Sequence, residues 1–167
     1  MPVLISRQAV PASPIGSVGL ARRAERMLQA LGLSDSELSI VVCDDATIHA
    51  LNRTHRRRNK PTDVLAFALR EGKPLPGAEA MLGDVVISLD TAQRQADERG
   101  HSLWTEVTTL LAHGLLHLIG YDHRTDAEER RMNARADILV SAATARLPQI
   151  SRKPVDKRRK AGEIRTR

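Results

Sequence analysis

The sequence of 167 residues is poor in the residue types that mark several common classes of protein. Cysteine occurs once, at Cys43, so no disulfide can form within the chain and a reducing compartment is favoured. Only three aromatic residues are present, namely Phe67, Trp104 and Tyr121. A module that stacks several RNA bases needs several exposed rings, so this composition argues against an ordinary single-strand-binding module.

Long hydrophobic runs are also missing. No run approaches the roughly 18 apolar residues of a membrane span. The first 16 residues lack the charged region and long apolar region of a secretory signal. These features predict a cytoplasmic protein with no membrane partner. Because hydrophobic residues still make up 41% of the sequence, we expect a globular fold, and the length suits one domain.

The net charge of +6 is confined to the end of the sequence. Residues 148–167 hold eight Lys/Arg and two Asp/Glu, whereas the remaining 147 residues hold 18 of each sign. We therefore predict a folded domain over 1–147 and a basic, disordered tail over 148–167. The tail could either serve only to keep the protein soluble or bind phosphates weakly.

Hydrophobic periodicity and turn residues predict strands that alternate with helices. The expected strands cover 2–6, 37–43, 62–69 and 82–89. The expected helices cover 20–32, 46–56, 90–100, 102–120 and 125–147, and a loop is expected over 71–81. This order predicts a single α/β domain with a mixed sheet of about four strands and helices packed against it.

The stretch HGLLHLIGYDH at 113–123 concentrates three of the six histidines. His113 and His117 lie four residues apart, which places them on one face of a helix, one turn from each other. Gly120 suits a left-handed turn, after which His123 can return to the same ion. Three imidazoles leave one tetrahedral position open, which is typical of catalytic zinc, although nickel, cobalt or manganese could also bind.

The spacing of these histidines is that of the metzincin proteases, which carry glutamate directly after the first histidine as the general base. Here that position is Gly114, so peptide hydrolysis by that route lacks its base. We expect the glycine to remove a side chain from one edge of the metal and to admit a bulky substrate.

The histidine stretch resembles the signature of the YbeY family of bacterial metal-dependent endoribonucleases. The similarity extends over about residues 37–140. Further blocks that resemble the family are LNRTHRRRNKPTDVLAF at 51–67, LGDVVIS at 82–88, QADERGHSLWTEVTTLLAHG at 95–114 and EERRM at 128–132.

The resemblance implies an endoribonuclease that acts in the maturation of ribosomal RNA, at the 3′ end of 16S rRNA, and in ribosome quality control. The implied partners are single-stranded RNA, ribosomal RNA and the small ribosomal subunit with its proteins, and no DNA is expected. The resemblance also implies one zinc ion (Zn²⁺) per chain, held by His113, His117 and His123.

Within the basic run RTHRRRNK at 53–60, the resemblance implies that Arg56 is the arginine needed for activity. A fixed guanidinium opposes the negative charge that develops on the phosphorus oxygens when a phosphodiester is cleaved. The sequence alone does not distinguish Arg56 from Arg57 or Arg58, and we interpret most of the run as a solvated loop.

Four acidic residues are further candidates. Asp63 and Asp84 could orient a histidine ligand or cap a turn, and capping is slightly favoured. Asp122 is next to His123, which does not by itself bring its side chain near the ion, and Glu106 could serve as a base only if its helix bends. A metallopeptidase and a non-catalytic ribosome-assembly factor with structural zinc remain the alternative functions.

Overall fold

The computed structural model describes residues 3–10, 13–58, 62–69 and 81–145. These residues form one α/β domain with a four-stranded mixed sheet, which confirms the predicted fold class. The strands are β1 (Val3–Gln8), β2 (Glu37–Cys43), β3 (Val64–Ala68) and β4 (Met81–Ser88). The helices are α1 (Ser17–Ala30), α2 (Asp45–Arg56), α3 (Leu89–Arg99), α4 (Leu103–Leu118) and α5 (Asp126–Thr144).

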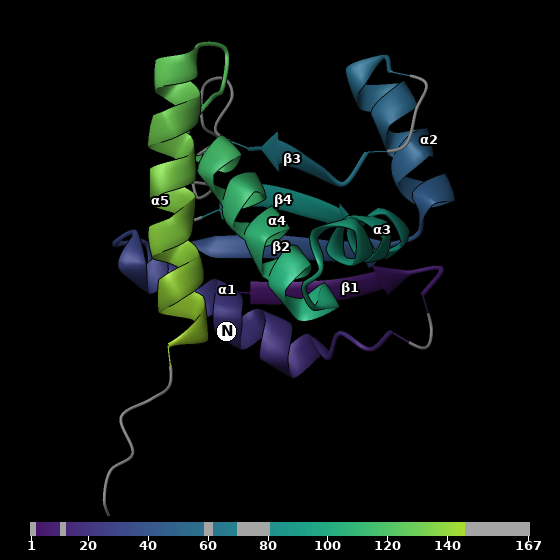
Figure 1. Cartoon of the computed structure of the whole chain (residues 1–167), viewed down its shortest axis with the longest axis horizontal. Coiled ribbons are helices and arrows are strands. Elements are labelled where there is room, and N and C mark those ends of the chain that lie inside the picture. Colours follow the sequence, from purple (N-terminus) through teal and green to yellow (C-terminus); the bar gives the residue numbers. More distant parts are fainter. Residues whose placement is uncertain (1–2, 11–12, 59–61, 70–80, 146–167) are drawn as a thin grey trace, which may run out of the picture.

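The strands lie in the order β1-β2-β4-β3. β1, β2 and β4 run parallel, whereas β3 pairs antiparallel with β4 and forms one edge of the sheet. Helices α1, α3, α4 and α5 contribute to the core on one face of the sheet, and Figure 1 shows α4 crossing in front of that face. Helix α2 packs on the opposite face through a smaller cluster around Ile48 and Val86.

The ends of several helices are set by capping and turn-forming residues. Asp44 and Ser102 accept hydrogen bonds from backbone N–H groups in the first turns of α2 and α4. Gly100 ends α3 in the left-handed conformation. α1 begins three residues before the predicted start, after Gly16, whose missing side chain offers no capping oxygen.

Some expectations lie outside the described residues. The predicted loop at 71–81 falls there except for Met81, which begins β4, and so does the predicted tail at 148–167. Among the residues that the structure describes, no helix combines the length and the apolar character needed to cross a membrane.

Candidate functional site

Helix α4 carries the first two histidines of the candidate site. Its buried residues fix it against the sheet and the neighbouring helices, and they occur from Glu106 to Leu118. The helix ends at Leu118, and Gly120 follows with φ of 101°, a conformation that few other residues adopt. The turn at Gly120 leads the chain back towards the helix end, so that His123 approaches His117.

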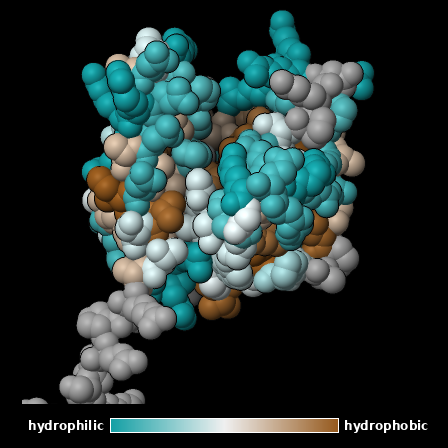
Figure 2. All heavy atoms as spheres, viewed as in Figure 1, coloured by the Kyte–Doolittle hydropathy of each residue, from teal (hydrophilic) through white to brown (hydrophobic). Residues whose placement is uncertain are grey.

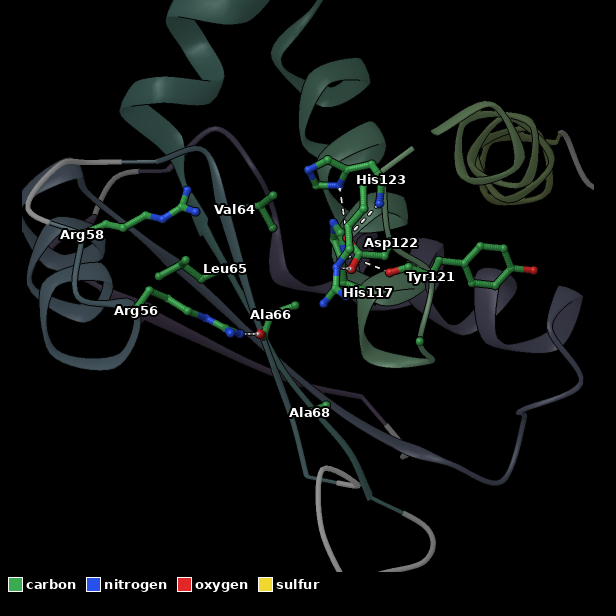
Figure 3. A pocket seen from close by; sticks show the side chains of 12 residues that line it. Arg56, Arg58, Val64, Leu65, Ala66, Ala68, His117, Tyr121, Asp122 and His123 are labelled. Atoms are coloured by element: carbon green, nitrogen blue, oxygen red, sulfur yellow. Dashed lines mark hydrogen bonds and ion pairs between the residues drawn. The ribbon is translucent and has the colours of Figure 1, made fainter. Parts of the chain in front are cut away.

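Three side chains converge at this turn. The candidate metal-binding atoms of His117, Asp122 and His123 all lie within 4.8 Å of one another, and the two imidazole ring centroids are 5.3 Å apart. Figure 3 shows the three side chains gathered on one side of a pocket. His113, one turn earlier on α4, is not part of this group. The convergence of Asp122 with the two histidines was not expected from the sequence.

The tautomer of His117 follows from its hydrogen bond. Its Nδ1 lies 3.0 Å from the backbone carbonyl oxygen of Tyr121, and because a carbonyl can only accept, Nδ1 carries the proton. The lone pair of Nε2 is then available to a metal ion, with the backbone orienting the ring. Burial lowers the pKa of His117, and the charges of His123 and Arg56 act in the same direction, which favours the neutral imidazole that metals require.

His113 is half-buried on α4. Burial is the main cause that lowers its pKa, followed by the charge of His117, whereas the carboxylates of Asp63 and Glu106 oppose the shift. The lowered pKa favours the neutral imidazole of His113 as well. The Asp63 carboxylate accepts hydrogen bonds from the Val64 N–H at 2.8 Å and from the Gln95 amide at 3.3 Å. Asp63 thus links the start of β3 to α3, which agrees with the favoured capping role.

The Asp122 carboxylate is engaged within its own loop. One oxygen accepts the N–H of His123 at 2.8 Å, and the other pairs with the Arg124 guanidinium at 2.7 Å. The bond from His123 N–H is the main cause that lowers the pKa of Asp122, with a further contribution from the Arg124 charge. These contacts suit a residue that shapes the turn around His123.

The expectation for Gly114 is wrong. A Cβ atom at this position would lie 2.6 Å from Val85 Cγ1 and 3.2 Å from Val64 Cγ2, so the glycine faces the sheet rather than the candidate metal site. Its function is to let α4 pack closely on β3 and β4. The glycine therefore leaves no room for a substrate, and a glutamate side chain there would collide with β4.

Arg56, at the end of α2, lies across the pocket from the histidines (Figure 3). Its guanidinium donates a hydrogen bond to the Ala66 carbonyl oxygen on β3 and lies 5.3 Å from the Phe67 ring centroid. These contacts hold a permanent positive charge at the pocket rim. Arg53 and His55 belong to the last turn of α2, so the basic run begins in a helix rather than in a loop.

The pocket between these groups has a volume of about 610 Å³. Its lining comes from the end of α2, from β3 and from the turn after α4, and it includes Arg56, Arg58, His117 and His123. Figure 2 shows the same face of the molecule hollowed between α2 and the region of the α4–α5 turn. This volume falls in the range of about 300–1,000 Å³ that is typical of small-ligand sites.

The remaining two candidate acids, Glu106 and Asp84, do not line the pocket. Glu106 is fully buried and binds Arg99 at 2.6 Å and His101 at 2.5 Å, which links α3 to the start of α4. Both of its carboxylate oxygens are thus occupied, which argues against a role as a base. Asp84 lines a separate hollow beside Leu4 and Met81.

The single cysteine offers no alternative chemistry. Burial raises the pKa of the Cys43 thiol to about 12, so the reactive thiolate is absent at neutral pH. The remaining chemistry belongs to the imidazoles, a neighbouring carboxylate and a fixed guanidinium. This donor set fits a zinc-like ion, because His117 presents a free nitrogen and His123 lies beside it.

Fold and site together define a single-domain α/β protein with a candidate metal centre at the end of its central helix. The model of the family described as Endoribonuclease YbeY matches residues 17–144. Endoribonuclease YbeY of Geobacter metallireducens is 49% identical over 124 residues, covering 73% of this chain and 83% of that protein. The chain therefore belongs to the YbeY family.

Two further comparisons agree in extent. Endoribonuclease YbeY of Pelotomaculum thermopropionicum is 49% identical over 145 residues, covering 84% of this chain and 95% of that protein. The solution structure of a Thermotoga maritima protein superposes with a TM-score of 0.60 at 24% identity, over 84% of this chain and 88% of that one. The second likeness concerns the fold alone.

Proposed function

We propose that this protein is a cytoplasmic, zinc-dependent endoribonuclease that cleaves single-stranded RNA. Its membership of the YbeY family makes it a metal-dependent, RNA-cleaving hydrolase. We further propose that it acts in ribosomal RNA maturation, at the 3′ end of 16S rRNA, and in ribosome quality control. In that role it contacts the small ribosomal subunit and its proteins.

The observation that carries this proposal is the pairing of two kinds of group across one pocket. His117 and His123 lie on one wall, and Arg56 lies on the other. A phosphodiester needs a group that promotes attack on phosphorus and a positive charge that opposes the developing negative charge. The pocket supplies both, which supports a phosphodiester over a peptide as the substrate.

We propose that the metal is held by His113, His117 and His123, with Asp122 shaping the turn rather than binding the ion. When bound, zinc supplies Lewis-acid catalysis. The Tyr121 carbonyl orients His117, and burial of His117 favours its neutral form. Because Ala66 and Phe67 already fix the Arg56 side chain, its guanidinium can address a phosphate with little reorganisation.

A metallopeptidase is less well supported. The residue after His113 is a glycine that faces β4, and the nearby Glu106 is engaged by Arg99 and His101. Neither of these two positions therefore supplies the base that the protease mechanism requires. The other alternative is a non-catalytic assembly factor. A measurement of RNA cleavage distinguishes it from the ribonuclease, because an assembly factor would not cleave RNA.

The experiment compares zinc-loaded protein on unstructured RNA, on fully paired RNA and on casein, each with and without a chelator. We expect cleavage of the unstructured RNA alone, and its loss on chelation. Casein hydrolysis would support the peptidase, and the absence of any cleavage after zinc repletion would support the assembly factor. Analysis of the product ends identifies the nucleophile, because a cyclic phosphate means that the ribose 2′-hydroxyl attacked the phosphorus.

A further inference from the structure

The pocket beside the histidines adjoins a second hollow. The second hollow has a volume of about 340 Å³ and is lined by Asn52, Arg56, Arg58, Thr62, Val64 and Leu65. Four of these residues, Arg56, Arg58, Val64 and Leu65, also line the first pocket. The two hollows thus adjoin at the start of β3, between the turn after α4 and the end of α2. We call the two hollows together the β3 groove.

The backbone at the end of α2 explains why two arginines line the β3 groove. Arg57 adopts the left-handed conformation, with φ of 54°, and the N–H of Arg58 bonds to the Asn52 carbonyl at 3.2 Å. This helix-ending turn reverses the chain within one residue. Arg56 and Arg58 consequently line both hollows, whereas Arg57, which the structure also describes, lines neither.

The two arginines differ in what they already bind. Arg56 is held by the Ala66 carbonyl and the Phe67 ring. Arg58 is exposed, and its guanidinium makes no hydrogen bond or ion pair with the residues that the structure describes. Figure 3 shows its side chain on the same side of the pocket as Arg56, across from the histidines. No carboxylate is among the described residues that line the second hollow, so its charge favours an anion.

We infer that Arg58 binds the phosphate next to the one that is cleaved, and that the second hollow receives the adjoining nucleotide. The inference rests on the proposed ribonuclease function and extends it, because it assigns the substrate a length of at least two nucleotides within the β3 groove. Each hollow has the size of a small-ligand site, so the groove suits a single strand rather than a duplex. A flexible, exposed arginine suits ground-state binding of that strand.

This assignment predicts that Arg56 acts mainly on the transition state and Arg58 mainly on substrate binding. Loss of a transition-state contact lowers kcat, whereas loss of uniform substrate binding raises KM. Arg58→Ala should therefore raise KM roughly three- to tenfold, the range of one phosphate contact in an exposed setting, with a smaller change in kcat. Arg58→Lys should restore part of the loss, because it keeps the charge without the planar fork.

The experiment measures kcat and KM on an unstructured RNA of about ten nucleotides, with Arg57→Ala as the matched control. In parallel, fluorescence anisotropy measures binding of the same RNA to chelator-treated protein at several salt concentrations. Arg58→Ala should weaken binding and lower the slope of log affinity against log salt by about one. Arg57→Ala should leave KM, affinity and slope near those of the wild type.

Equal effects of Arg57→Ala and Arg58→Ala would overturn the inference, as would a loss confined to kcat. Wild-type protein that binds the RNA without cleaving it would contradict the proposed function, while the affinity data would still decide for or against Arg58. Wild-type protein that neither binds nor cleaves would overturn both.

Discussion

His117 is the side chain on which the candidate site depends most directly. Its Nδ1–H is committed to the Tyr121 carbonyl, and its other nitrogen lies among the candidate ligand atoms of Asp122 and His123. His113 lies one turn earlier on the same helix. Two sets of metal ligands are therefore to be distinguished by experiment. One consists of His113, His117 and His123, and the other of His117, His123 and Asp122.

We predict about one zinc per chain, and a loss of more than about tenfold in zinc affinity for alanine at His113, His117 or His123. Asp122→Asn should retain zinc, because its oxygens serve the His123 N–H and Arg124. Elemental analysis and competition with a chromogenic chelator measure this. If Asp122→Asn loses zinc as severely as His117→Ala while His113→Ala retains it, the ligand set is the one with Asp122.

Arg56→Ala should lower kcat for RNA cleavage about a hundredfold, or about 3 kcal/mol, because one preorganised donor to the transition state is removed. Arg56→Lys should recover part of the rate. Arg53→Ala is the control, because Arg53 is an exposed arginine of the same helix that lines neither hollow. A similar loss of rate for Arg53→Ala, at equal zinc content, would mean that the whole run binds phosphate diffusely.

Sequence reasoning at the residue scale succeeded where local geometry decides. A spacing of four places His113 and His117 on one face of α4, whatever the rest of the fold does. It missed Asp122, since the conformation after Gly120 decides where that carboxylate points. It misjudged Gly114, because its neighbour Val85 belongs to a distant strand.

At the scale of elements, α4 and β4 form the contact that positions the site. Gly114 brings the helix so close to the sheet that a methyl group would require Val85 to move. The helix residues before and after Gly114 carry the candidate ligands. The close packing of α4 on β4 at Gly114 therefore also determines where His113 and His117 lie.

Gly114→Ala should lower the free energy of unfolding by about 1–3 kcal/mol through overpacking against Val85, although alanine has the better helix propensity. Thermal unfolding of the purified variant measures the change. Val85→Ala in the same chain should relieve part of the clash. Gly16→Ala is the control for an added methyl group without a clash, since nothing lies within 4 Å of a Cβ there, and any loss of stability should come only from the poorer N-cap of α1. Unchanged stability of Gly114→Ala would show that α4 does not press on β4.

Element boundaries were predictable where a residue itself ends the element. β2 runs over Glu37–Cys43 as predicted, and α3 lies within one residue of its predicted bounds. Asp44 and Gly100 supply local signals, namely a capping carboxylate and a left-handed turn. α5 instead ends at Thr144, three residues before the predicted end.

At the scale of the whole molecule, the alternation of helices and strands predicted the fold class. It did not predict the order β1-β2-β4-β3 or the antiparallel direction of β3, because strand pairing depends on contacts between distant parts of the chain. That order matters for function. It makes β3 an edge strand, and the edge forms the floor between Arg56 and the histidines.

Near residue 145, the last that the structure describes, Arg26 donates hydrogen bonds to the carbonyl oxygens of Ala143 and Ala145 at 3.1 and 3.0 Å. We propose that the folded domain ends near Leu147, since the tail composition offers little to bury. Truncation after Leu147 keeps these bonds and should leave Tm nearly unchanged. Truncation after Ser141 removes them together with buried Ala143 and should lower Tm clearly. A large drop for the first truncation would show that the tail docks on the domain.

The central claim is that the histidine site holds a metal ion that RNA cleavage requires. The most direct measurement is a titration of metal-free protein with zinc, in which cleavage of an end-labelled, unstructured RNA is followed for the wild type and for His117→Ala. We predict that wild-type cleavage rises from zero and levels off near one zinc per chain, while His117→Ala stays inactive at that zinc concentration. Full cleavage by metal-free wild type, or by His117→Ala at the same zinc concentration, would contradict the account.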